Sequence, residues 1–176
     1  LRADLIREEG ADAIRTLADV EIGSYEVARE IIGRDPEKWR PATRETADHS
    51  FPYCVAAALM DGRLTLQSFS PKRLADPALS ELMSHVRVVS LPDFDGAYPD
   101  RMPTRLTAIT AKGTTYRTQV DLPLGHPGRP LSDQQVEDKF RRLASRRLSG
   151  TRLTRLITFV WNLEDVHDIG TLMPLL

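Results

Sequence analysis

The stretch "RETADHSFPYCVAAALMDG", residues 44–62, joins a cluster of ionisable and polar side chains to an apolar run. Asp48 or Ser50 can cap a helix here, since a short polar side chain accepts a hydrogen bond from a free backbone N–H. Pro52 then falls in the first turn, where the missing N–H of proline costs no hydrogen bond. The pattern predicts a buried helix over residues 48–61 with a polar beginning.

Two ionisable residues of this beginning, His49 and Tyr53, are four positions apart, so they can project from one side of the first turn. Free backbone N–H groups and the positive end of the helix dipole favour an anion at such a place. In the structural alternative, Asp48 and Ser50 only cap the helix, His49 bonds to a neighbouring carbonyl, and Tyr53 is a core residue with a satisfied hydroxyl. The residues alone favour this structural alternative.

The composition is that of a soluble globular protein. The 176 residues are 41% hydrophobic and 28% charged, and 24 basic residues face 25 acidic ones, so no overall field recruits nucleic acid or an anionic membrane. The single cysteine, Cys54, excludes an internal disulfide and a metal site built from cysteines. No apolar run approaches the ~20 residues of a membrane span, and nothing resembles a signal peptide. We expect a cytoplasmic protein without nucleic-acid or membrane partners.

Strand and helix patterns alternate over the first two thirds of the chain. Asp76 and Pro77 predict the capped beginning of a further helix. Alternating apolar residues predict strands over 14–25 and 86–91, and a hairpin with a two-residue turn at Lys112-Gly113. The predicted fold class is α+β: a small antiparallel sheet of three or four strands with packed helices, in one domain over residues 1–176.

The last third predicts two amphipathic helices. Ser132 and Gln135 form a capping box, and an apolar stripe follows as far as Gly150. Thr151 is expected to cap the next helix, and "VHDIGTLMPLL" to add a short terminal one.

Local motifs indicate neither a metal centre nor a cofactor. The histidines are dispersed, with no i, i+4 pair on a helix, so no metal site is expected within the chain; they are His49, His85, His126 and His167. The basic run "KFRRLASRR" has its arginines off the apolar stripe, which is typical of a solvated face rather than a nucleic-acid patch. No glycine-rich phosphate loop or GxSxG motif occurs.

Four segments together resemble one protein family. In chain order they are "RPATRETADHSFPYCVAAALMDG", "YPDRMPTRLT", "GHPGRPLSDQQVEDKFRRLA" and "WNLEDV". They resemble the C-terminal portion of the MmgE/PrpD family, which includes 2-methylcitrate dehydratase, cis-aconitate decarboxylase and iminodisuccinate epimerase. The resemblance covers nearly all of the 176 residues.

The resemblance implies a two-domain enzyme with its active site in the cleft between the domains. Residues 1–176 would form the α+β lid domain. The larger all-helical N-terminal domain is not part of these 176 residues, and it would belong either to a longer form of the same polypeptide or to another polypeptide. Leu1 stands where a helix is already in progress, so we expect a fragment that is inactive alone. A homo-oligomer is also expected.

The implied chemistry is metal-independent proton transfer next to a carboxylate on a small di- or tricarboxylate, without a cofactor. Dehydration, as in 2-methylcitrate dehydratase, is the expected outcome. Decarboxylation of the cis-aconitate type, epimerisation, and a non-catalytic lid or dimerisation module are the alternatives.

The resemblance also suggests site residues. Tyr53 is expected to point into the cleft as a catalytic group, with His49 as the second catalytic candidate. Arg44 could pair bidentately with a substrate carboxylate, although a surface arginine more often holds a neighbouring carboxylate. Ser50 and His126 are further candidates for substrate binding, and the structural alternative for His126 is to fix the turn "GHP".

Overall fold

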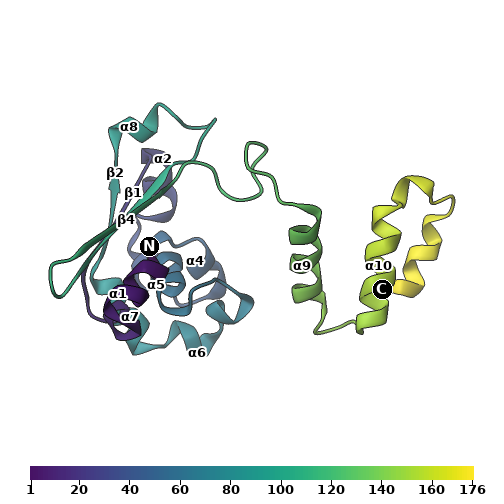
Figure 1. Ribbon diagram of the computed structural model, residues 1–176, viewed down its shortest axis with the longest axis horizontal. Helices are drawn as coiled ribbons and strands as arrows, with labels where there is room; N and C mark the ends of the chain where they lie inside the picture. Colours follow the sequence, from purple (N-terminus) through teal and green to yellow (C-terminus); the bar gives the residue numbers. More distant parts are fainter. The chain divides into compact units, whose positions relative to one another are not determined.

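The computed structural model describes residues 1–176, which form two compact units, Leu1–Pro123 and Leu124–Leu176. We call them the sheet unit and the helical unit (Figure 1). The division falls at the stretch "PLGHPGRP", residues 123–130, where prolines and glycines interrupt regular structure. The sequence pattern was interpreted above as one domain over this whole length.

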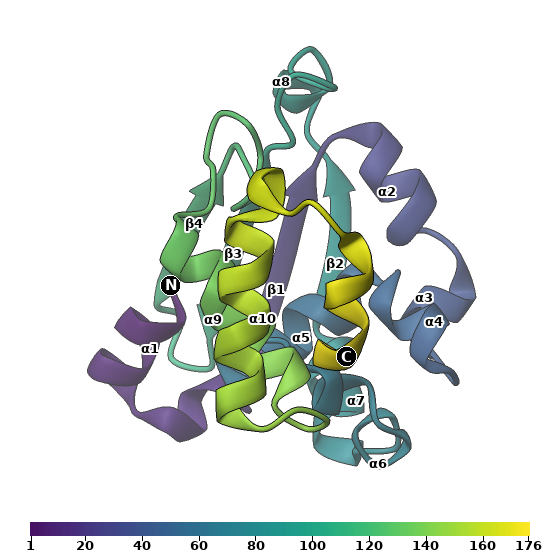
Figure 2. The same ribbon diagram turned by 90° about the vertical axis from the view of Figure 1, so that its right-hand side faces the viewer.

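The sheet unit is built on four strands in the order β2-β1-β3-β4, with β1 at Leu17–Ser24, β2 at Val86–Ser90, β3 at Thr104–Thr110 and β4 at Thr115–Val120. β3 pairs antiparallel with both β1 and β4, but β1 and β2 are parallel, as Figure 2 shows. The α+β class is therefore confirmed, while the purely antiparallel sheet is wrong. The reason is the long helical connection from β1 to β2, which returns the chain to the end of the sheet where β1 began.

Helices cover the apolar face of this sheet. Leu5, Leu59 and Leu79 are buried in one core with Val20 and Ile22 of β1. The helices of the sheet unit are α1 (Arg2–Glu9), α2 (Glu26–Ile32), α3 (Pro36–Trp39), α4 (Arg44–Asp48), α5 (Phe51–Asp61), α6 (Pro71–Leu74), α7 (Pro77–Ser84) and α8 (Pro92–Asp95), with 3₁₀ turns at Ala11–Ile14 and Leu66–Phe69.

The opposite face of the sheet is polar. Arg87 of β2 donates to Asp19 at 3.0 Å and also bonds to Glu21, both on β1. These residues alternate with the buried Val20 and Ile22, as expected for side chains that point to opposite faces of one strand.

Most predicted boundaries in the sheet unit hold. Asp76 caps α7 by accepting from the Ala78 N–H at 2.9 Å, and the 104–122 hairpin forms. The hairpin loop is longer than the predicted two residues, because β3 ends at Thr110 and β4 begins at Thr115. Gly113 supplies the positive φ of 87° that this turn requires.

The helical unit contains α9 (Asp133–Ala144) and α10 (Gly150–Trp161), with 3₁₀ turns at Leu163–Asp165 and Ile169–Leu175. The capping box of α9 is confirmed, since Ser132 and Gln135 bond reciprocally. The predicted cap of the next helix is wrong: Ser149, not Thr151, accepts the Arg152 N–H, because Ser149 already has the extended backbone of a cap. No helix of the structure combines the length and apolarity of a membrane span.

Candidate functional site

Ser50 fixes the beginning of α5. Its hydroxyl oxygen accepts from the Tyr53 N–H at 3.1 Å, and its hydroxyl donates to the carbonyl of Lys38 in α3. Because Ser50 is buried and both bonds are internal to the sheet unit, this geometry gives it the role of a cap that ties α5 to α3.

Tyr53 lies in the core of the sheet unit. Its side chain is 1% exposed, its ring packs against Phe69, and its hydroxyl donates to the carbonyl of Ser68 at 2.5 Å. Burial raises the pKa of Tyr53 to about 12, so the hydroxyl stays protonated at neutral pH. The one proton that Tyr53 can donate is used by the backbone of the Leu66–Phe69 turn.

His49 lies outside α5, at the C-terminal end of α4. The side chain is 71% exposed, and Nδ1 lies 2.6 Å from an oxygen of Asp48 and 3.2 Å from the carbonyl of Glu45. Because Ser50 caps α5, His49 and Tyr53 are not brought together in one first turn. Their catalytic roles remain predictions.

The other two candidates are Arg44 of the sheet unit and His126 of the helical unit. Arg44 begins α4, where its side chain is exposed and forms no ion pair. His126 belongs to the helical unit, where Nδ1 accepts the Gly128 N–H at 3.0 Å and so fixes its own turn.

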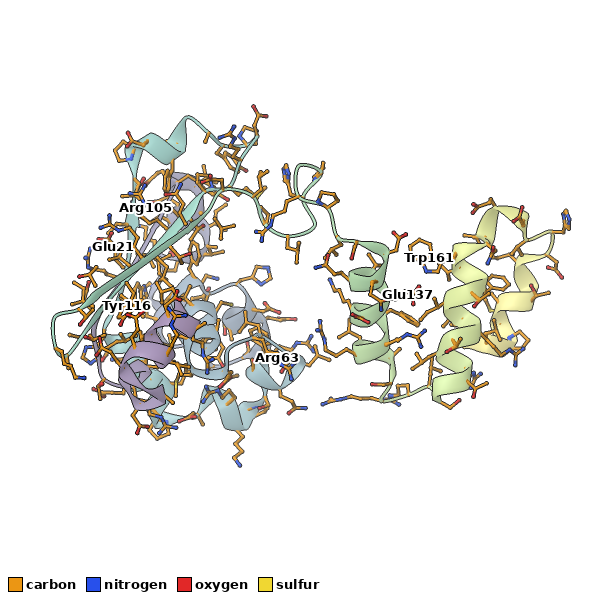
Figure 3. All side chains as sticks on the ribbon, in the orientation of Figure 1. Glu21, Arg63, Arg105, Tyr116, Glu137 and Trp161 are labelled. Atoms are coloured by element: carbon orange, nitrogen blue, oxygen red, sulfur yellow. The ribbon has the colours of Figure 1, made fainter.

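A cavity of about 380 Å³ adjoins Tyr53 through the Ser68 carbonyl, which accepts the tyrosine hydroxyl. Its lining comes from the end of α5, the following loop and α6: Asp61, Arg63, Thr65, Gln67, Ser68 and Arg73. Figure 3 shows Arg63 at the surface of the sheet unit. No local sequence pattern predicts this cavity, because its residues form no motif and Asp61 and Arg73 are twelve positions apart.

Arg73 organises this cavity. Its guanidinium donates to Asp61 at 2.8 Å and to Asp76, the cap of α7, and its side chain is only 16% exposed. Its Nε is buried and has no hydrogen-bond partner. Arg73 therefore joins α5, α6 and α7 and fixes one wall of the cavity.

Neither a thiol nucleophile nor a metal cluster is evident in the geometry. Burial raises the pKa of the Cys54 thiol to about 11, so it stays protonated and is a poor nucleophile at neutral pH. No three His, Cys, Asp or Glu side chains are grouped so as to hold a metal ion.

Comparison with known proteins identifies relatives of two activities. The chain is 36% identical to human cis-aconitate decarboxylase over 141 residues, which are 77% of this chain and 28% of that protein. The mouse cis-aconitate decarboxylase is 34% identical over 136 residues, 77% of this chain and 28% of the relative. A 2-methylcitrate dehydratase from Cupriavidus necator is 31% identical over 137 residues, 74% of this chain and 28% of the relative. The chain thus spans 28% of the length of these curated relatives.

These relatives are lyases by name, a decarboxylase and a dehydratase. Residues 3–165, which include the whole sheet and both amphipathic helices of the helical unit, match the family model of the MmgE/PrpD C-terminal domain. The chain therefore belongs to the MmgE/PrpD family.

Proposed function

We propose that this chain is the C-terminal part of a lyase that decarboxylates a small tricarboxylate of the cis-aconitate type. The observation that carries this proposal is the identity to two cis-aconitate decarboxylases, 36% and 34%, against 31% for the dehydratase. The sequence resemblance placed dehydration first, and these identities favour decarboxylation instead.

The proposed reaction replaces a carboxylate by a proton. Cleavage of the carbon–carboxylate bond releases CO₂ and leaves the electron pair on the substrate, where a proton must be delivered to carbon. The site therefore needs a protonated donor and fixed positive groups around the remaining carboxylates. Tyr53 fits the donor role in its protonation state, since burial holds its pKa at about 12. To reach substrate, its hydroxyl would have to exchange the Ser68 carbonyl for the substrate.

Dehydration is the second candidate, supported by the 31% identity to 2-methylcitrate dehydratase. It also needs a proton transfer at a carbon next to a carboxylate, but here the proton is removed from carbon and the leaving group is water instead of CO₂. In this reaction a protonated Tyr53 would donate to the departing hydroxyl group, and a separate base would take the proton from carbon.

The test uses the full-length protein with cis-aconitate and 2-methylcitrate as separate substrates. We expect CO₂ release from cis-aconitate and, in Tyr53→Phe, a kcat lower by roughly 10²-fold. The variant should also lose about 1 kcal/mol of stability, because the Ser68 carbonyl loses its donor. Tyr25→Phe is the control, since Tyr25 stacks on Tyr98 and its ring is kept.

Three results would change the proposal. Water loss from 2-methylcitrate without CO₂ release would favour the dehydratase. No turnover of either acid would leave a non-catalytic module. A folded Tyr53→Phe protein with near-native kcat would assign Tyr53 a purely structural role.

A further inference from the structure

Two cavities of the sheet unit share Arg73 in their lining. The first, of about 380 Å³, is the cavity beside Tyr53 described above, and Arg63 is part of its lining. The second, of about 490 Å³, has Lys72 and Asp76 in its lining. Both cavities share Gln67 and Arg73, so they form one continuous surface over α6 and the turn before it.

The charges of this surface do not cancel. Arg73 is held between Asp61 and Asp76, which fixes its guanidinium and occupies both carboxylates. Arg63 and Lys72 form no ion pair, and both are exposed. One positive charge is therefore left over, and it belongs to side chains that are free to bind an anion.

The uncommitted polar atoms at this surface are mainly donors. The side chains of Arg63 and Lys72 can only donate, and the side-chain amide of Gln67 makes no hydrogen bond. Thr65 already accepts the Gln67 N–H at 3.2 Å, which leaves its hydroxyl proton to donate. A ligand that only accepts hydrogen bonds, such as a carboxylate, complements this set.

We propose that Arg63 and Lys72 form a subsite for two carboxylates of one small di- or tricarboxylate, each cation binding one carboxylate. Two free cations whose cavities share a fixed guanidinium select a ligand with two negative groups over one with a single group. Ser68 connects this subsite to the Tyr53 hydroxyl. That the bound polycarboxylate is the substrate rests on the proposed function.

The first experiment measures binding to the 176-residue chain by NMR, with cis-aconitate, propionate and inorganic phosphate as separate probes. We expect cis-aconitate to shift the amide signals of Thr65, Gln67 and Ser68 and to bind more weakly as salt is added. Arg63→Gln and Lys72→Gln should each weaken its affinity about threefold to tenfold, as for charge-assisted hydrogen bonds near the surface. Arg117→Gln is the matched control, because Arg117 on β4 is also exposed and forms no ion pair.

Each other outcome overturns the subsite. Absence of cis-aconitate shifts at these amides, or equal weakening by the Arg117 control, would remove the site. Equal affinity for propionate or phosphate would show a general anion surface instead of a polycarboxylate site.

A second measurement separates this proposal from the proposed function. In the full-length protein, Arg63→Gln and Lys72→Gln should raise the KM for cis-aconitate with little change in kcat. If the wild type turns over cis-aconitate and both variants keep its KM, the subsite is wrong and the lyase function stands. If the chain binds cis-aconitate through Arg63 and Lys72 but the full-length protein releases no CO₂, the function is wrong and the subsite stands.

Discussion

The sheet unit and the helical unit differ in how far their apolar side chains are buried. In the sheet unit, side chains from helices and strands close one core, and Ile22 and Leu79 are almost completely buried. In the helical unit, Leu156 is buried, but Val160 is 54% and Trp161 is 46% exposed. An apolar stripe of helical period is enough to predict a helix, but burial needs a second element that covers the stripe.

The groove between α9 and α10 shows this difference in detail. It has a volume of about 280 Å³, and its lining is largely apolar: Val136, Glu137, Phe140, Leu156, Ile157, Val160 and Trp161. Glu137 accepts the indole N–H of Trp161 at 3.0 Å. Figure 3 labels both side chains. A second polar contact between the two helices runs from Arg141 to the hydroxyl of Thr154 at 3.2 Å, so polar contacts contribute to holding this unit together.

The largest expected effect is the loss of stability when a leucine of the core is truncated to alanine. Leu79→Ala in α7 removes a side chain that is 1% exposed, and we expect it to cost about 2–5 kcal/mol of stability. Leu143→Ala in α9 removes one that is 45% exposed, and the expected cost is below about 1 kcal/mol. Urea denaturation measures both, because each unit has one tryptophan, Trp39 or Trp161.

Single-tryptophan variants, Trp161→Phe and Trp39→Phe, report the two units separately. A common transition at both tryptophans, shifted equally by Leu79→Ala, would show that the two units unfold together. The expected difference in stability between the units would then be wrong.

The second largest expected effect is that alkaline pH lowers the stability of the sheet unit more than that of the helical unit. All four tyrosines and the cysteine belong to the sheet unit. Burial raises the pKa of Tyr53 to about 12 and that of Cys54 to about 11. These folded-state pKa values exceed the unfolded ones, which are about 10 for tyrosine and 8.5 for cysteine. The two protonated groups therefore contribute fully to the stability of the folded state below the unfolded pKa values, and this contribution is lost as pH rises toward 11–12.

The measurement is the urea midpoint at each tryptophan between pH 8 and pH 11. The midpoint at Trp39 should fall as pH rises, whereas the midpoint at Trp161 should change much less. Tyr53→Phe with Cys54→Ala should make the fall at Trp39 less steep, and the raised pKa of Tyr116, about 12, should account for a remaining part. An equal fall at both probes would contradict the assignment of this pH dependence to Tyr53 and Cys54.

Local sequence signals predicted local structure well. The capping box of Ser132 and Gln135, the Asp76 cap and the 104–122 hairpin depend on residues close in sequence, and the structure has all three. The parallel pairing of β1 with β2 depends on how some sixty intervening residues return the chain, which no short pattern encodes. Long-range pairing was therefore the part of the fold that the sequence left open.

The candidate site likewise has features that the local sequence predicts and contacts that depend on residues far apart in the chain. The polar beginning of α5 was visible in the sequence, yet the contacts of Tyr53 depend on Ser68, fifteen positions away. The free cations Arg63 and Lys72 were not singled out, because an exposed arginine or lysine has no distinguishing local pattern. Only the fold shows that Asp61 and Asp76 occupy Arg73 and leave the other two cations unpaired.

The smallest expected effect compares two serine caps. Ser50→Ala removes a buried hydroxyl that accepts the Tyr53 N–H and donates to the Lys38 carbonyl, so we expect a loss of about 1–2 kcal/mol at the Trp39 probe. Ser132→Ala removes an exposed cap of α9, and we expect about 0.5–1 kcal/mol at the Trp161 probe. Ser132→Thr keeps the capping oxygen and serves as the control for the second site. A loss at Ser132 equal to that at Ser50 would contradict the view that burial of the cap, and not capping alone, sets the size of the effect.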